Sequence, residues 1–332
     1  MDLDISVVIC TYNRSESLRA VLHSLEQMNV PPHLLWEVIV VDNNSKDSTQ
    51  TVVKQFDGSK LHIKYVFEPA QGLSHARNRG VKESAGNIVS FIDDDVVVAQ
   101  DWLLEVKNAF NQYQVACVGG KVPLRKDLIK PQWWHEDYNN AIGACDKGDR
   151  VIIADTNYLG LIGIGANLSF RRASFEKYGD FKTDLGRIGS SLLMGEEAEF
   201  CNRLRTNGEL LIYYPKAVVY QCPDIDRMTK QYVRRWFFRI GEWLYLQDDL
   251  LKVNTKQVKR IFGVPRWMYK VAAKNAISFV HLYSIRRQKD AFHNMIQLIT
   301  FLGYAYGSVK HGLWGKRKFS PSSTVGAYPS KD

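Results

Sequence analysis

The sequence lacks the patterns that indicate an extracellular or membrane-spanning protein. Its five cysteines are odd in number and include no C-x-x-C pair, so we expect no disulfide framework and a reducing compartment. The opening segment, MDLDISVVIC, is acidic, and its apolar stretch is too short for a signal peptide. There is also no set of long apolar runs that would cross a bilayer. These absences predict a cytoplasmic protein.

Two classes of motif are missing as well. A dinucleotide-binding dehydrogenase needs G-x-G-x-x-G after a strand, and the nearest glycine cluster, Gly160, Gly163 and Gly165, has a different spacing. The chain contains no recognised nucleic-acid-binding motif, so we expect no nucleic-acid partner.

Positive charge is concentrated in the last third of the chain. Residues 1–222 contain 24 Lys and Arg against 28 Asp and Glu, whereas residues 223–332 contain 20 against 7. This asymmetry indicates an anionic partner surface, and the mixture of aromatic and basic residues over 224–318 is typical of helices that lie in a membrane interface. Residues 291–309 carry no formal charge, but polar side chains interrupt them, which argues against a span. We expect peripheral attachment to the cytoplasmic face of a membrane; the alternative is that these helices pack on the catalytic domain.

The first half of the chain alternates between strand and helix patterns. One helix is predicted to start at Asn13, because Glu16 has the spacing of a capping box. Apolar strands joined by crossover helices form a parallel sheet, which binds ligands beyond the carboxyl ends of its strands. The predicted strands are ISVVICT (5–11), WEVIVVD (36–42), HIKYVF (62–67), NIVSFID (87–93), 165–172 and 210–214, with helices over 73–84 and 196–205. Thr11, Asp42 and Asp93 then end three strands at one crevice.

An acidic triplet, Asp93-Asp94-Asp95, follows the fourth strand directly. In an extended chain residues i and i+2 share one side, so Asp93 and Asp95 would face one ion. Carboxylate ligands suit Mg²⁺ or Mn²⁺, which would neutralise charge on a diphosphate leaving group. The alternative is a solvated turn, but three adjacent carboxylates repel one another unless a cation is present.

Other polar segments have two readings each. Asp42 would accept a hydrogen bond from a nucleotide base, or it is a helix N-cap or forms a turn. Beside it, Tyr12 would stack on the base and Thr11 would form a hydrogen bond with it. Arg77 would bind phosphate oxygens, or it is solvated. The pair Trp133-Trp134 is a sugar-stacking platform or part of a core.

The segment Gly195-Glu196-Glu197-Ala198-Glu199 opens a helix. Its carboxylates suit the positive end of the helix dipole, or one of them is a base that accepts the proton of an acceptor hydroxyl.

In order along the chain, these segments resemble the family-2 glycosyltransferases, which have the GT-A fold. The resemblance covers about residues 5–220, and six segments carry it: TYNR, VVDNNSKD, GLSHARNRG, FIDDD, GANLSFRR and GEEAEF. It implies an α/β GT-A catalytic domain over 1–222, with the nucleotide sugar bound within about 1–120 and the acceptor within about 121–222. A basic helical extension over 223–318 and a flexible tail over 319–332 would follow.

The resemblance also implies roles for individual residues. Asp93 and Asp95 would match the metal-associated Asp-x-Asp pair, with Mn²⁺ or Mg²⁺ as the cofactor. Members usually have Glu-Asp where this chain has Glu196-Glu197, so Glu197 would be the catalytic base and Glu196 its alternative. The residues implied at the nucleotide are Thr11, Tyr12, Asn13, Arg14, Asp42, Asn44, Arg77, Asp93 and Asp94. Those expected at the acceptor are Trp133, Trp134 and Asn167.

The implied reaction is inverting transfer of a sugar, by default from a UDP-sugar, to an acceptor hydroxyl in polysaccharide, glycolipid or cell-envelope glycan synthesis. Processive synthases carry Gln-x-x-Arg-Trp, but here Gln231 and Arg235-Trp236 are one residue too far apart, which favours one sugar per acceptor. The alternatives are a nucleotidyltransferase and a non-catalytic sugar- or lipid-binding protein on a transferase scaffold.

Overall fold

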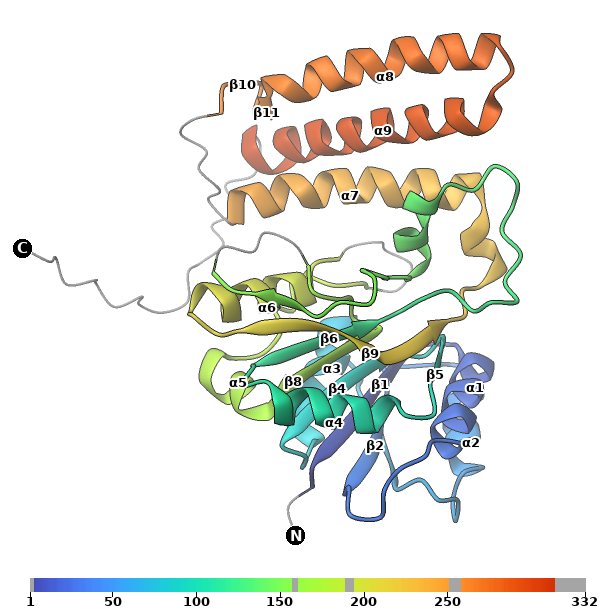
Figure 1. Ribbon diagram of the computed structural model, residues 1–332, viewed down its shortest axis with the longest axis vertical. Coiled ribbons are helices and arrows are strands. Elements are labelled where there is room, and N and C mark those ends of the chain that lie inside the picture. The colour runs from blue at the N-terminus through green and yellow to red at the C-terminus, as the bar shows by residue number, and fades with distance from the viewer. Residues whose placement is uncertain (1–2, 157–160, 189–193, 251–257, 314–332) are drawn as a thin grey trace, which may run out of the picture. The chain divides into compact units, whose positions relative to one another are not determined.

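The computed structural model describes residues 3–156, 161–188, 194–250 and 258–313 (Figure 1). The chain divides into two compact units, Met1–Trp236 and Phe237–Asp332. We had expected the division after residue 222. It falls later because Asp224 and Arg227 form ion pairs with side chains of the first unit. The tail expected over 319–332 lies outside the described residues.

The first unit is built on a mixed sheet. In the described part of the chain the strand order is β3-β2-β1-β4-β8-β6-β9-β5, and β7 pairs with β9. Strands β3, β2, β1 and β4 are parallel to one another, whereas β8 runs antiparallel to both β4 and β6. The strands are β1 (Ile5–Thr11), β2 (Trp36–Asp42), β3 (Ile63–Phe67), β4 (Ile88–Asp93), β5 (Val96–Val98), β6 (Cys117–Lys121), β7 (Ile152–Ala154), β8 (Asn167–Arg171) and β9 (Leu211–Gln221). A mixed α/β sheet flanked by helices is the architecture expected from the sequence.

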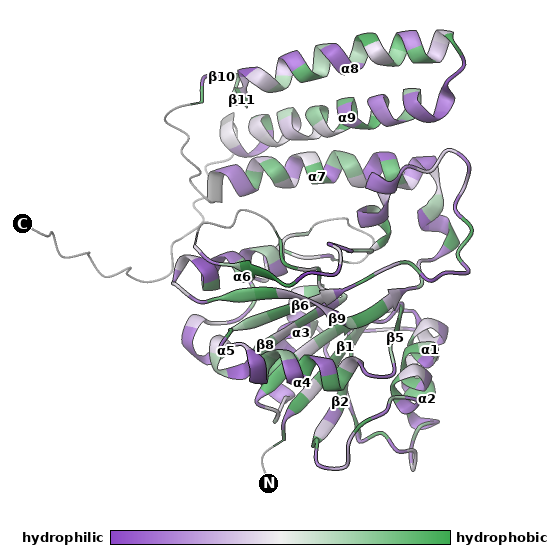
Figure 2. Cartoon of the chain, in the orientation of Figure 1, coloured by the Kyte–Doolittle hydropathy of each residue, from purple (hydrophilic) through white to green (hydrophobic). Residues whose placement is uncertain are grey.

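Helices cover both faces of this sheet, which is why its central strands are continuous apolar runs (Figure 2). On one face, Ile5 and Ile9 of β1 pack in one core with Leu22 of α1 and Trp102 of α4. On the other face, Val8 packs in a second core with residues of α3, α5 and α6. The helices are α1 (Ser15–Glu26), α2 (Thr49–Lys54), α3 (Leu73–Glu83), α4 (Trp102–Gln112), α5 (Arg172–Tyr178) and α6 (Glu196–Thr206), with 3₁₀ turns η1 (Glu136–Ile142) and η2 (Ile225–Met228).

The capping box expected at Asn13 is wrong. Helix α1 begins at Ser15, and Asn13 has a positive φ of 52°. The Asn13 Oδ1 accepts a hydrogen bond from the backbone N–H of Lys46 (2.7 Å), and Glu16 pairs with Arg19. The segment after β1 is therefore held by the loop after β2 and does not cap its own helix.

The second unit is a set of helices. Helix α7 (Lys230–Leu250) enters it from the first unit, and α8 (Arg266–Ser284), α9 (Gln288–Gly307) and the π-helical η3 (Ser308–Leu313) follow, with a small hairpin of β10 (Arg260–Ile261) and β11 (Val264–Pro265). Gly241 of α7 and Gly303 of α9 allow close backbone approach, since a Cβ on Gly241 would lie 2.1 Å from the Thr300 carbonyl oxygen. Among the described residues, no helix has the length and apolar content needed to cross a membrane.

Candidate active site

The carboxyl ends of β1, β2 and β4 meet at one edge of the sheet. In the strand registers Thr11 lies opposite Asp42, and Cys10 lies opposite Asp93. The convergence expected of Thr11, Asp42 and Asp93 is therefore confirmed.

The acidic triplet bends at this edge. Asp93 is the last residue of β4, and Asp94 and Asp95 form a turn, so the extended-chain argument for aligning Asp93 with Asp95 is wrong. Asp94 accepts hydrogen bonds from Thr11 Oγ1 (2.8 Å) and Arg14 Nη1 (2.7 Å). Tertiary contacts, rather than strand periodicity, orient these carboxylates.

Two arginines from distant segments neutralise Asp95. Its Oδ2 lies 3.0 Å from Arg14 Nη1 and 2.9 Å from Arg227 Nη1, and the other Nη of Arg14 pairs with Asp224. Sequence reasoning missed Arg227 and Asp224, because they lie in and before η2, in a basic segment for which we had expected membrane association or packing on the catalytic domain and no role in the site.

The electrostatics of the turn require cations. Burial raises the pKa of Asp94 to about 6 even though Arg14 opposes the shift. Burial acts the same way on Asp95, but Arg227 and Arg14 hold the pKa of Asp95 below its usual range. The Asp93 side chain is 41% exposed, and its Oδ1 is 3.9 Å from Arg77 Nη2. Three carboxylates of which one is accessible form a donor set that fits a hard divalent cation.

The end of β2 is an ordered loop. Asp42 Oδ1 accepts from the backbone N–H of Ser45 (2.8 Å), and Oδ2 accepts from the hydroxyl of Tyr65 (2.8 Å). Asp42 therefore forms a turn, which was one of the interpretations of the sequence. It also lies at the carboxyl edge of the sheet, so a hydrogen bond from a nucleotide base to Asp42 remains a prediction. Sequence reasoning also missed Tyr65, on β3.

Two residues expected at the nucleotide share an unusual backbone conformation. Asn13 and Asn44 have positive φ values of 52° and 66°. Lys46 connects them, since its N–H donates to Asn13 Oδ1 and its Nζ donates to Asn44 Oδ1 (3.1 Å). Tyr12, between these turns and β1, is exposed.

A buried arginine joins the acidic turn to the start of α6. The Arg77 guanidinium donates to Glu196 Oε1, and its Nη1 lies 3.6 Å from Glu197 Oε2. Gly165 provides the space, because a Cβ there would lie 2.0 Å from Arg77 Nη2. We had expected Arg77 at the diphosphate; instead the structure gives its guanidinium these carboxylate partners and leaves it almost no solvent exposure.

The two glutamates differ in environment. The Glu196 side chain is 3% exposed and that of Glu197 is 22% exposed. Burial and the adjacent Glu197 raise the pKa of Glu196 to about 8. Burial also acts on Glu197, but the charge of Arg77 and a hydrogen bond from Glu196 hold the pKa of Glu197 below its usual range. Near neutral pH, Glu197 is therefore the ionised and accessible member of the pair.

Two of the three residues expected at the acceptor are core residues. Asn167 is buried; its Oδ1 accepts from Trp102 Nε1 (3.0 Å), and its Nδ2 donates to backbone carbonyls. Trp134 is also buried and donates to Asn139 Oδ1. Neither offers a face to an acceptor, so these expectations are corrected. Trp133 is half-buried, with Lys230 Nζ 5.8 Å from its ring centroid.

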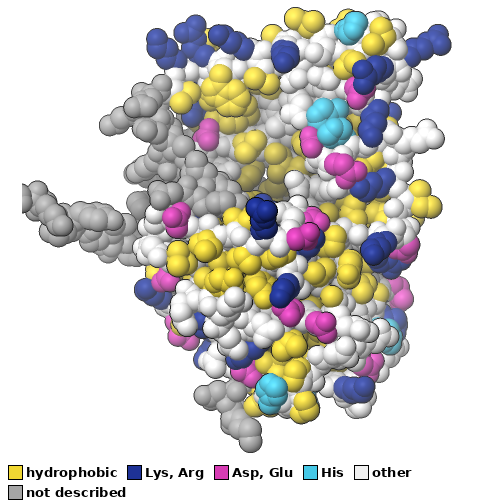
Figure 3. All heavy atoms as spheres, viewed as in Figure 1, with side chains coloured by type: hydrophobic (Ala, Val, Ile, Leu, Met, Phe, Trp, Pro, Cys, Tyr) yellow, Lys and Arg dark blue, Asp and Glu magenta, His cyan; other side chains and the backbone are white. Residues whose placement is uncertain are grey.

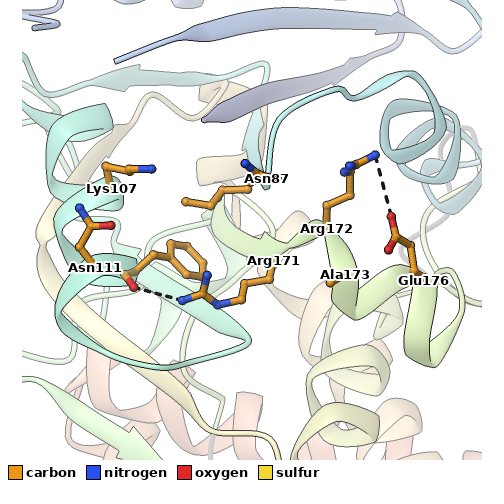
Figure 4. A pocket seen from close by; sticks show the side chains of 9 residues that line it. Asn87, Lys107, Asn111, Arg171, Arg172, Ala173 and Glu176 are labelled. Carbon is orange, nitrogen blue, oxygen red and sulfur yellow. Dashed lines mark hydrogen bonds and ion pairs between the residues drawn. The ribbon is translucent and has the colours of Figure 1, made fainter. Parts of the chain in front are cut away.

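A separate pocket of about 430 Å³ lies at the opposite end of β4, beside Asn87 and Ile88 (Figure 4). Its Arg171 donates to the carbonyl oxygens of Val115 and Phe110, and its Arg172 lies 3.9 Å from Glu176. These cations already have protein partners, so the pocket adds nothing to the site at the carboxyl edge.

Comparison with known proteins gives one family. The model described as "Glycosyl transferase family 2" matches residues 6–179. The succinoglycan biosynthesis protein ExoM of Rhizobium meliloti is 29% identical over 243 residues, which are 72% of this chain and 74% of that protein. The glucosyl-dolichyl phosphate glucuronosyltransferase of Haloferax volcanii is 30% identical over 321 residues, covering 92% of this chain and 96% of that one.

Solved structures agree on the fold. A mannosyltransferase from Pyrobaculum calidifontis, solved with GDP-Man and Mn²⁺, superposes with a TM-score of 0.62 at 18% identity and covers 95% of this chain and 88% of its own. TarS of S. aureus, solved with UDP-GlcNAc, superposes with a TM-score of 0.54 at 16% identity and covers 89% and 90%. At these identities the likeness shows the fold alone.

Proposed function

Because the chain belongs to glycosyl transferase family 2, we propose that it transfers one sugar from a nucleotide-diphosphate donor to a hydroxyl of a lipid-linked glycan, with inversion at the anomeric carbon. The family decides against the nucleotidyltransferase and the non-catalytic scaffold considered above. The donor, the acceptor and the stereochemistry are the parts that we propose.

One observation carries the mechanism: Arg77 lies within ion-pair distance of both Asp93 and Glu197. The carboxylate suited to a metal–diphosphate and the carboxylate suited to a base are therefore held beside one guanidinium. A donor whose diphosphate lies at the acidic turn would place its anomeric carbon near α6.

Asp93 and Asp95 are the residues that would hold Mn²⁺ or Mg²⁺, which when bound supplies positive charge to the diphosphate leaving group. Arg14 and Arg227 already lie at the same turn, and guanidinium groups match phosphate oxygens. We expect both arginines to move from carboxylate to phosphate partners when the donor binds.

Glu197 is the proposed base. Its carboxylate takes the proton of the acceptor hydroxyl as that oxygen forms a bond to the anomeric carbon and the bond from that carbon to the diphosphate breaks. Glu196 remains bonded to Arg77 and positions its neighbour. Direct displacement of this kind inverts the anomeric centre.

The proposed acceptor class rests on the Haloferax volcanii protein, because the similarity extends over almost the whole length of both chains. Its name specifies a sugar carried on dolichyl phosphate. We propose a polyprenyl-phosphate-linked sugar as the acceptor class for this chain, and a UDP-sugar as the donor.

A donor screen tests the proposal. The protein is incubated with UDP-glucose, UDP-N-acetylglucosamine, UDP-glucuronate or GDP-mannose in Mn²⁺ or Mg²⁺, with and without a polyprenyl-phosphate-linked glucose. We expect acceptor-dependent release of nucleoside diphosphate and, by NMR, a product of inverted configuration. A product with retained configuration, or equal release with a lipid-free glycan, would overturn the corresponding part.

A further inference from the structure

Among the described residues, helix α8 packs mainly on α9 and also contacts the small β10–β11 hairpin, where the Tyr269 hydroxyl donates to the carbonyl oxygen of Ile261. In the second unit α9 lies between α7 and α8 (Figure 1), and no residue of α8 is fully buried. The half-buried positions of α8 recur at helical spacing, and the Tyr269 ring lies 5.3 Å from Phe301 of α9. These positions are Met268, Tyr269, Ala272, Asn275, Ser278, Phe279 and Leu282. Within the part of the chain that the structure describes, every other position of α8 is exposed.

The open face mixes large apolar side chains with cations. Trp267 is 57% exposed, Ile277 73% and Tyr283 66%, and Val271 and Val280 are also exposed. Figure 3 shows hydrophobic and basic side chains interspersed at this end of the second unit. Large apolar side chains gathered on one exposed helix face, with polar and charged groups beside them, mark an interaction surface.

The stretch of chain that contains α8 carries formal charge of a single sign. Residues 258–289 contain eight Lys and Arg and no Asp or Glu. Arg266, Lys270 and Lys274 of α8 are exposed. Two cations beside the helix already have partners, since Arg260 pairs with Asp248 and Arg287 with Asp290.

We propose that the outer face of α8 docks on an anionic phospholipid bilayer without crossing it. The cations complement lipid head groups, and Trp267, Ile277 and Val280 gain by insertion at the acyl boundary, as in interfacial helices. A nucleic acid would satisfy the cations but would offer nothing to exposed Ile and Val. Docking would hold the protein where lipid-linked acceptors are, but the inference does not depend on the proposed reaction.

Vesicle binding by the full chain tests this surface. Sedimentation is measured with neutral phosphatidylcholine vesicles and with vesicles that contain phosphatidylglycerol, over a range of salt. We expect binding to the anionic vesicles only, and weaker binding as salt rises. Lys270→Gln/Lys274→Gln should weaken binding about 30-fold, because each basic residue near an anionic leaflet contributes about 1 kcal/mol. Gln and Lys have similar helix propensity, so circular dichroism should be unchanged.

The matched control is Lys54→Gln/Lys82→Gln, which removes two exposed helical lysines of the first unit. It should bind vesicles as the wild type does. Ile277→Ser should weaken binding without changing its dependence on salt. Three results would overturn the proposal: no binding to anionic vesicles, equal binding by both double variants, or salt-sensitive binding to duplex DNA together with no binding to vesicles. The release of nucleoside diphosphate is measured separately, without vesicles. A loss of vesicle binding with unchanged release would concern the docking surface alone, and a loss of release with unchanged vesicle binding would concern the proposed reaction alone.

Discussion

At the scale of single residues, Arg77 organises the site. Its guanidinium contacts Glu196 and lies within ion-pair distance of Glu197 and Asp93, which come from two distant segments. A buried cation with several carboxylate neighbours fixes their positions and their protonation. The catalytic assignments are therefore best tested by substitutions that keep the shape of each side chain.

Glu197→Gln should lower transfer by about 10²–10⁴-fold and leave donor affinity unchanged, because the amide cannot accept the hydroxyl proton. Glu196→Gln is the matched control. With its pKa raised to about 8, Glu196 is largely neutral at pH 7, and the Gln oxygen still accepts from Arg77, so we expect less than about a tenfold loss. Initial rates measure transfer by the two variants, and calorimetry measures their affinity for the donor. If Glu196→Gln lost transfer and Glu197→Gln kept it, Glu196 would be the base and Glu197 the positioning residue.

Asp95→Asn should abolish metal-dependent donor binding, since a neutral amide is a poor ligand for a hard cation. Asp224→Asn is the control, because Asp224 also pairs with Arg14 but is much more exposed. Mn²⁺ titration followed by electron paramagnetic resonance should separate the variants. If Asp95→Asn bound Mn²⁺ like the wild type, the assignment of Asp95 as a ligand would be incorrect.

Asp42→Ala should weaken UDP binding by about 10- to 150-fold, the worth of a charge-assisted hydrogen bond of about 1.5–3 kcal/mol. Tyr65→Phe removes only the hydroxyl that donates to Asp42 and should change affinity much less. Calorimetry with UDP measures both. Equal affinities in Asp42→Ala and wild type would leave Asp42 with its turn-forming role alone.

At the scale of elements, a buried carboxylate ties η3 to α7. Glu242 accepts from Lys310 Nζ (2.9 Å), pairs with Arg239, and lies 3.0 Å from His311 Nε2. Burial opposes ionisation, but the hydrogen bonds from His311, Lys310 and Arg239 lower the pKa of Glu242 to about 2. A lowered pKa contributes stability that is present above the ordinary value of 4.5 and is lost as pH falls through about 2.

Glu242→Gln should therefore destabilise the second unit by about 2–4 kcal/mol near pH 7. The difference in Tm from wild type should be constant down to about pH 5 and should narrow as the pH approaches 2. Asp290→Asn removes an exposed pair with Arg287 and should cost less than about 1 kcal/mol. Thermal melts at several pH values test this, and a difference in Tm that did not depend on pH would contradict it.

At the scale of the whole molecule, the charge is divided between the two parts of the chain. The balance is −4 over residues 1–222 (24 minus 28) and +13 over 223–332 (20 minus 7). The acidic part contains the sheet and the carboxylates of the site, and the basic part contains α8. Ionic strength should therefore change the attachment of the protein to a membrane and have little effect on the rate of sugar transfer.

We predict that the chain, expressed in cells, fractionates with membranes at low salt and is released by high salt or alkaline carbonate without detergent. Nucleoside diphosphate release in solution should vary little over the same range of salt. Fractionation followed by immunoblotting measures the share of the protein that is bound to membranes. A coupled assay measures the release of nucleoside diphosphate. Recovery in the soluble fraction at low salt would count against attachment.

The sequence by itself determined the framework. Apolar runs such as ISVVICT identify buried strands locally, and strands joined by crossover helices pack in parallel, so the parallel first half of the sheet and the edge that carries Thr11, Asp42 and Asp93 were predictable. The order β3-β2-β1-β4 came from the structure. The motifs also pointed to the family.

Only the tertiary structure decided which polar groups meet. Arg227 and Tyr65 reach their carboxylates from elements that no local pattern connects to the site, and Asn13 binds a neighbouring loop instead of capping its own helix. Asn167 and Trp134 have residue types that suit a sugar site, yet both are buried. Burial depends on which surfaces pack together, and sequence spacing records only what is near along the chain, so these assignments required the folded arrangement.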